Sequence, residues 1–155
     1  PLDETKNLHK KKSHFSKIQI KEYSILFIMI NYLDVVSKQI EELTEITFST
    51  EKNENLKKLI ISLIIEKKDK ETINSKILID NDKLIKEINE NSSIQVITKA
   101  KNDKAIQDLL HDLISEFKEL NNLRKIESLE KKLINNLDEN SYSELIRLKN
   151  QINRD

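Results

Sequence analysis

The chain has no cysteine, no glycine and no tryptophan among its 155 residues, and its one proline is Pro1. Without glycine it lacks the residue that most readily takes positive φ in tight hairpins, phosphate-binding loops and dinucleotide-binding turns. Without cysteine it cannot form disulfides, cysteine-ligated zinc sites or a thiol nucleophile. These absences argue against sheet-rich and nucleotide-cradling folds, and we expect an all-α, soluble, intracellular protein.

Neither sign of charge is in excess. Lys and Arg total 27, as do Asp and Glu, so the formal net charge is zero and no global field draws the chain to polyanions. The charged fraction of 35% is typical of amphipathic helices with solvated outer faces. The longest apolar run, Ile25 to Ile30, has six residues, far fewer than the roughly 18 that a membrane span needs. We therefore expect no membrane association.

The start of the chain, residues 1–17, has almost no hydrophobic periodicity and contains the tract Lys10-Lys11-Lys12. We interpret it as a flexible basic linker. Contact with nucleic acid through the lysines between Lys10 and Lys21 is an alternative, but few aromatic residues accompany them, so such binding is expected to be weak at most. Because the sequence opens on Pro1 and not on Met, we expect it to be a piece of a larger protein.

Residues 18–101 hold several short apolar segments with polar breaks between them, which predicts a compact helical bundle. The stretch SILFIMI has the β-propensity of a buried strand. Without glycine or proline to turn it, we predict a buried helix that ends near Asn31. Further helices are predicted over Leu33–Leu43, from Ser49 or Thr50 onward, and around Ile73–Ile79, Asp82–Ile88 and Ser93–Lys99.

The apolar positions change sides along the next segment. At about 100° per residue, the stripe from Ile106 to Phe117 shares one helix face, whereas Ile126, Leu129, Leu133 and Leu137 share a nearly opposite one. Either the helix breaks near Asn121-Asn122, or one long helix serves the bundle with its first half and something else with its second. We assign residues 102–122 to a connecting long helix and residues 123–155 to a C-terminal helical hairpin.

The hairpin would pair Leu123–Leu137 with Ser141–Asn153. Ser141 and Glu144 have the S-x-x-E spacing of a capping box, which predicts that Ser141 starts the second helix. Leu148 and Ile152 lie to one side of the stripe formed by Tyr142, Leu145 and Ile146, so one partner helix would not cover them all. Exposed apolar residues on so small an element indicate a docking surface.

Catalytic chemistry has no candidate site. His9 and His14 lie in the basic start, and His111 is expected to face solvent; no ligands converge on any of them. Carboxylates such as Glu127 have a lysine four positions on, here Lys131, which is typical of surface pairs. Nothing assembles a nucleophile, a base and an oxyanion hole. We expect no enzymatic activity, metal or cofactor in this chain.

Three stretches in order carry a family resemblance, and together they cover nearly the whole chain from Ile18 to Ile152. They are KEYSILFIMINYLDVVSKQIEELTEITFSTEKNENLKKLIISLI, AIQDLLHDLISEFKELNNLRKIESLEKKLINNL and LDENSYSELIRLKNQI. This succession resembles the C-terminal helicase-binding domain of bacterial DNA primase (the DnaG type). One departure is Tyr32, where that family often has a proline, which leaves the end of the first helix open.

The resemblance implies a non-catalytic part of primase in the bacterial cytoplasm. Its hairpin would bind the N-terminal domains of the hexameric replicative helicase and recruit primer synthesis to the replication fork, and its bundle would modulate helicase and primase activity. The isolated chain is expected to be mainly monomeric. The contact surface that the resemblance implies consists of Tyr142, Leu145, Arg147, Leu148, Lys149, Gln151 and Ile152, with Leu133 and Leu137 in support.

Two other functions stay open at this point. One is a basic helical nucleic-acid-binding domain that uses Lys10–Lys21, whose affinity would fall steeply with salt. The other is a helical adaptor, or the related N-terminal domain of the helicase itself, which would self-associate.

Overall fold

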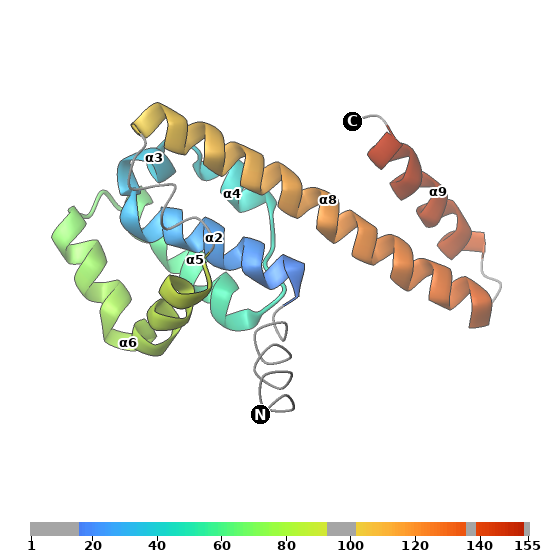
Figure 1. Cartoon of the computed structure of the whole chain (residues 1–155), viewed down its shortest axis with the longest axis horizontal. Helices are drawn as coiled ribbons and strands as arrows, with labels where there is room; N and C mark the ends of the chain where they lie inside the picture. The colour runs from blue at the N-terminus through green and yellow to red at the C-terminus, as the bar shows by residue number, and fades with distance from the viewer. Residues whose placement is uncertain (1–15, 93–101, 136–138, 154–155) are drawn as a thin grey trace, which may run out of the picture. The chain divides into compact units, whose positions relative to one another are not determined.

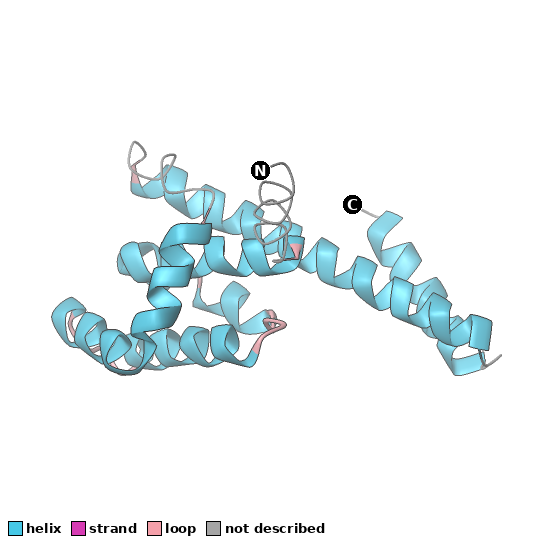
Figure 2. Ribbon diagram, turned by 60° about the horizontal axis from the view of Figure 1, so that its bottom comes forward, coloured by secondary structure: helices cyan, strands magenta, loops and turns pink. Residues whose placement is uncertain are grey.

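In a computed structural model, the chain is built from helices without a strand over the residues that the structure describes, which are 16–92, 102–135 and 139–153 (Figures 1 and 2). The predicted all-α class is confirmed. No helix in these ranges combines the length and the apolar character that crossing a membrane requires. The helices are α2 (Lys17–Asn31), α3 (Leu33–Ser37), α4 (Ile40–Glu45), α5 (Glu51–Ile65), α6 (Lys70–Asn91), α8 (Asp103–Asn135) and α9 (Glu139–Asn153).

The chain divides into two compact units inside α8, between Ile114 and Ser115. This point falls within the segment predicted to connect bundle and hairpin. The first unit is a bundle of α2 to α6 together with the start of α8, and the second contains the rest of α8 and α9. Of the predicted basic linker, residues 1–15 lie outside the described residues.

Helix α2 is the centre of the bundle. Its first turn is held by a capping box, in which Ser16 Oγ accepts from the Gln19 amide at 3.2 Å and Gln19 Oε1 accepts from the Ser16 amide at 3.0 Å. Every residue from Glu22 to Met29 is buried, as expected for a helix surrounded by others, and α2 packs against α5 and α6. The prediction of a buried helix ending near Asn31 is confirmed, and the strand alternative is excluded.

The short helix predicted over Leu33–Leu43 is two helices, α3 and α4, so that prediction was wrong in detail. They are separated at Lys38 and Gln39. The Gln39 side chain is buried at this break, and its Nε2 donates to the Gln107 carbonyl at the start of α8, at 3.1 Å. A contact this distant in sequence stabilises a break that local spacing does not reveal.

Helix α5 starts after Thr50, as predicted, and ends in a Schellman turn. Lys67 takes the left-handed conformation with φ at 58°. The Lys68 amide donates to the Leu63 carbonyl at 3.2 Å, and the Lys67 amide donates to the Ile64 carbonyl at 3.0 Å. Glycine is the usual residue at such a position because it has no Cβ; this chain places a lysine there instead.

Helix α6 is kinked at Asn81, whose φ of −125° and ψ of 20° are not helical. The two helices predicted around Ile73–Ile79 and Asp82–Ile88 lie on either side of this kink, and both are confirmed as parts of α6. The Asn81 side chain donates to the Ile77 carbonyl at 3.1 Å, which satisfies a carbonyl next to the irregularity. The helix predicted over Ser93–Lys99 lies outside the described residues.

Helix α8 runs through Asn121-Asn122 without a break, which decides between the two alternatives for this segment. Its buried residues change sides as the sequence predicted. On the first face Ile106, Leu110, Leu113, Ile114 and Phe117 are buried, whereas on the second face Ile126 is buried and Leu129 and Leu133 are partly buried.

Candidate interaction surface on the hairpin

The hairpin has a small core of its own. Helix α9 folds back beside the distal half of α8 (Figure 1). Ile126 of α8 is buried with Leu145 and Leu148 of α9, and Leu129, Leu133 and Ile152 pack against them partly buried. On each helix these residues follow the i, i+3, i+7 spacing that places side chains on one face. Three buried side chains are few for an element of this length.

The rotation of α9 differs from the one predicted. Leu145 and Leu148 are only 7% and 2% exposed, so the expectation that Leu148 lies outside the hairpin packing was wrong. At about 100° per residue, Leu145, Leu148 and Ile152 fall within an arc of about 60° that faces α8, and Tyr142 and Ile146 lie about 100° round from its centre. Helix α8 does not cover all of these residues, as expected, but Leu145 is covered with Leu148 and Ile152, while Tyr142 and Ile146 stay exposed.

The predicted start of α9 was also wrong. The helix begins at Glu139, so Ser141 lies inside its first turn and is not the N-cap.

The other residues that the resemblance implied are spread over both sides of the hairpin. Arg147 is exposed and its Nε donates to Glu144 at 3.1 Å, and this hydrogen bond holds the pKa of the Glu144 carboxyl below its usual value. Lys149 Nζ lies 3.2 Å from Glu130 Oε1 across the two helices. Gln151 is exposed, Leu133 is half-buried, and Leu137 lies outside the described residues.

Four large apolar side chains of the hairpin are exposed among the described residues. Tyr142 and Ile146 of α9 are 57% and 42% exposed, and Leu123 and Ile134 of α8 are 43% and 83% exposed. Sequence reasoning missed the two on α8, although both lie away from the Ile126 stripe by about 60° to 80°.

These four side chains lie on one side of the hairpin, which the Lys149–Glu130 ion pair makes clear. Glu130 lies seven positions after Leu123 and four before Ile134, so it shares their helix face. Lys149 lies seven positions after Tyr142 and three after Ile146, so it shares theirs. Because the two charges meet across the hairpin, both exposed stripes point to the same side. We call Leu123, Ile134, Tyr142 and Ile146 the apolar hairpin face.

Comparisons with known proteins add no relative: no family model, no curated protein and no solved structure matches this chain. The candidate site therefore rests on the sequence and on the surfaces of the molecule itself.

The most polar buried group of the bundle is Glu22, which is fully buried on α2. Its Oε2 accepts from the Ser49 amide at 2.9 Å and from Ser49 Oγ at 2.6 Å. Its Oε1 accepts from Thr50 Oγ1 at 3.3 Å and from Asn53 Nδ2 at 2.9 Å. Four donors saturate this carboxylate, and burial excludes substrate, so its role is to hold the start of α5.

A second buried charge, Lys57 on α5, is 3% exposed. Its Nζ lies 2.7 Å from Glu54 Oε1, donates to the Ile46 carbonyl and sits 5.1 Å from the centre of the Phe48 ring. These contacts fix the segment between α4 and α5 and leave no reactive amine.

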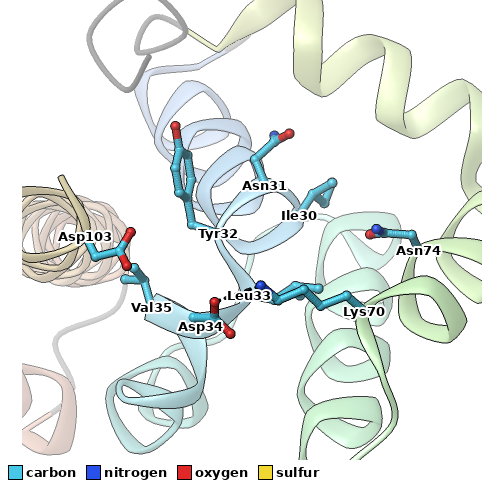
Figure 3. Close-up of a pocket in the computed structure, with 9 residues that line it drawn as sticks. All are labelled: Ile30, Asn31, Tyr32, Leu33, Asp34, Val35, Lys70, Asn74 and Asp103. Carbon is cyan, nitrogen blue, oxygen red and sulfur yellow. Dashed lines mark hydrogen bonds and ion pairs between the residues drawn. The ribbon is translucent and has the colours of Figure 1, made fainter. Parts of the chain in front are cut away.

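An open hollow of about 270 Å³ lies where α2 meets α3, beside the start of α6 (Figure 3). Lys70 and Asp34 form an ion pair of 2.8 Å at its rim, and this hydrogen bond raises the pKa of Lys70. Both side chains are well exposed, and the carboxylate of Asp103 also lines the hollow. Across residues 16–92, 102–135 and 139–153, no group of three or more His, Cys, Asp or Glu could hold a metal ion.

His111 is exposed, as predicted, but it is not isolated. Its Nδ1 lies 2.9 Å from Glu42 Oε2, so α8 is joined to α4 within the first unit. The hydrogen bond to Glu42, followed by the charge of that carboxylate, raises the pKa of His111. The pair faces solvent, and its role is to hold α8 against α4.

Proposed function

We propose that this chain is a non-catalytic protein-interaction domain, the helicase-binding domain of a bacterial DNA primase. Its hairpin would bind the N-terminal domains of the hexameric replicative helicase and recruit primer synthesis to the replication fork. The bundle would modulate helicase and primase activity, and the chain would act in the bacterial cytoplasm without a cofactor. The resemblance in residue pattern supplies the partner, and the exposed apolar side of the hairpin is the observation that supports binding.

The hairpin surface supports this proposal through its energetics. A two-helix element with three buried apolar side chains is marginal by itself, because short helices gain most of their stability from packing. Burying an apolar side chain of this size is worth about 1.5–3 kcal/mol relative to leaving it in water. A partner that covers the hairpin would therefore gain affinity and stabilise the hairpin at the same time.

The proposal is tested by titrating the full chain into the N-terminal domains of the replicative helicase of the same organism and following sedimentation. We expect a complex with the wild-type chain. Leu148→Asp places a charge in the hairpin core and should abolish the complex, because the hairpin surface is lost with its core.

The matched control is Ile79→Asp, the same kind of change at a 75% exposed position of α6 in the bundle. It should bind as the wild type does. Absence of a complex with the wild-type chain would falsify the proposal, and so would full binding by the Leu148→Asp chain with its bundle still folded by circular dichroism.

A further inference from the structure

The exposed apolar positions of the distal half of α8 coincide with its acidic side. At about 100° per residue, the four acids between Ser115 and Asn135 fall within an arc of about 80° that also contains Leu123 and Ile134. The five bases of the same segment lie on the opposite side of the helix, outside both this arc and the stripe of Ile126, Leu129 and Leu133, and all nine charged residues are exposed. The acids are Glu116, Glu119, Glu127 and Glu130, and the bases are Lys118, Arg124, Lys125, Lys131 and Lys132.

Helix α9 does not supply enough basic residues beside the apolar hairpin face to neutralise the acidic side of α8. Its base next to Tyr142 and Ile146 is Lys149, which pairs with Glu130. Arg147 and Glu144 pair with each other on the outer side of α9, away from the apolar hairpin face. The apolar hairpin face is therefore bordered along α8 by more carboxylates than bases, while the opposite side of α8 is basic.

We infer that the apolar hairpin face receives one amphipathic helix of the partner, with an apolar stripe flanked by Lys or Arg. The helix would lie along the seam between α8 and α9, with Tyr142 and Ile146 on one side of its stripe and Leu123 and Ile134 on the other. Its basic flank would lie over Glu119 and Glu127. This is the helix-in-groove mode of recognition with complementary charge at the border.

The charge pattern favours this occupant over a second copy of the chain. Two copies joined face to face would each bring an acidic border to the same interface, and like charges across an interface are unfavourable. The inference deepens the proposed function, because it names the side of the hairpin and the chemistry of the helicase element that binds there. It differs from the contact set implied by the resemblance, since Arg147 lies away from this side.

The first experiment measures binding of the full chain to two synthetic 18-residue helical peptides by fluorescence anisotropy. Both carry the same leucine stripe, flanked by lysines in one peptide and by glutamates in the other. We expect the basic peptide to bind at least about tenfold more tightly than the acidic one, a difference that added salt reduces. Equal or tighter binding of the acidic peptide would overturn the inference.

Variants then locate the binding site of the basic peptide. Tyr142→Gln with Ile146→Gln should weaken binding by about 30-fold or more, as loss of central apolar anchors does. The matched control, Arg147→Ala, changes an exposed residue on the other side of α9 and should bind as the wild type does. If the first pair binds normally, or the control variant loses binding, the face is assigned wrongly.

A double variant, Glu119→Gln with Glu127→Gln, tests the carboxylates. It should lower the affinity for the basic peptide and flatten its salt dependence, whereas Glu144→Gln on the outer side of α9 should do neither.

Sedimentation of the chain alone tests whether a second copy of the chain binds to the apolar hairpin face. A dimer that Tyr142→Gln with Ile146→Gln dissociates would overturn the inference in favour of a second copy.

Repeating the variants with the helicase separates the two proposals. A helicase complex that survives Tyr142→Gln with Ile146→Gln would leave the proposed function standing and overturn the inference. A chain that binds the basic peptide at this face but never the helicase would overturn the proposed function alone.

Discussion

The two units of this protein use the same material, amphipathic helices rich in isoleucine, leucine and lysine, in opposite ways. The bundle buries every residue of α2 from Glu22 to Met29, and it supplies partners from within to the buried charges of Glu22 and Lys57. The hairpin buries three apolar residues and leaves four large ones in water. The bundle also exposes Ile65, Leu78 and Ile79, but it does so around a much larger buried core. The hairpin exposes more large apolar side chains than it buries, so it has the surface of an element that a partner completes.

Removal of the Glu22 carboxylate should have the largest effect on the stability of the bundle. Glu22→Ala removes a fully buried carboxylate and leaves four donors without their acceptor, of which Asn53 Nδ2 is buried, and we expect it to lower the free energy of unfolding by about 3 kcal/mol or more. Denaturant unfolding of the full chain, followed by circular dichroism, measures this. Glu41→Ala on the exposed side of α4 is the control, with an expected change within about 0.5 kcal/mol. A Glu22→Ala chain as stable as the control would show that the bundle does not depend on its polar interior.

A smaller effect, confined to one region, is expected from Leu148→Ala. Truncating a buried leucine costs about 2–5 kcal/mol, which is more than a two-helix element of this size has to spare. Hydrogen exchange should therefore speed up along α9 and the distal part of α8 while α2 stays protected. Ile146→Ala, at an exposed position of the same helix, should leave exchange unchanged. Loss of protection in α2 as well would mean that the two units are not independent.

The smallest expected effect concerns His111, whose pair with Glu42 joins α8 to α4 in the bundle. The hydrogen bond raises the pKa of His111 above its unfolded value of about 6.5. The stabilisation is therefore fully present below that unfolded value, and it is lost as pH rises through the higher pKa of the folded state. The difference in unfolding midpoint between the wild type and His111→Gln should accordingly shrink from pH 5.5 to pH 8.5. A difference that stays constant over this range would contradict a stabilising role of the His111–Glu42 pair. An unshifted pKa of His111, measured by NMR, would contradict it as well.

Local pattern was enough to predict the elements that depend on it. The run from Ile25 to Ile30, in a chain with no glycine to turn it, predicted a core helix, and the spacing from Ile106 to Leu133 predicted a helix that buries opposite faces in its two halves. Both follow from the geometry of a helix alone. The kink at Asn81 also lies where the sequence leaves a polar gap between two apolar segments.

What escaped prediction depends on partners distant in sequence. The break at Gln39 is supported by the Gln107 carbonyl, 68 positions away, and no local signal marks it. The rotation of α9 could not be chosen from sequence because Leu145 can be grouped with Tyr142 and Ile146 on one side or with Leu148 and Ile152 on the other. Only the position of α8 decides which side of α9 is covered. Because α8 covers Leu148, the candidate interaction surface lies at Tyr142 and Ile146 instead.

The manner in which α5 begins has a consequence for how the bundle forms. Thr50, the residue before its first turn, makes no side-chain bond to the helix, and its hydroxyl donates to Glu22 instead. The start of α5 has Glu51 and Glu54 in its own first turn, and Glu22 adds a third carboxylate from a helix that lies 28 positions earlier in the chain. Neither helix is fully stabilised until the other has docked, so α2 and α5 should appear together during folding, in a single cooperative step.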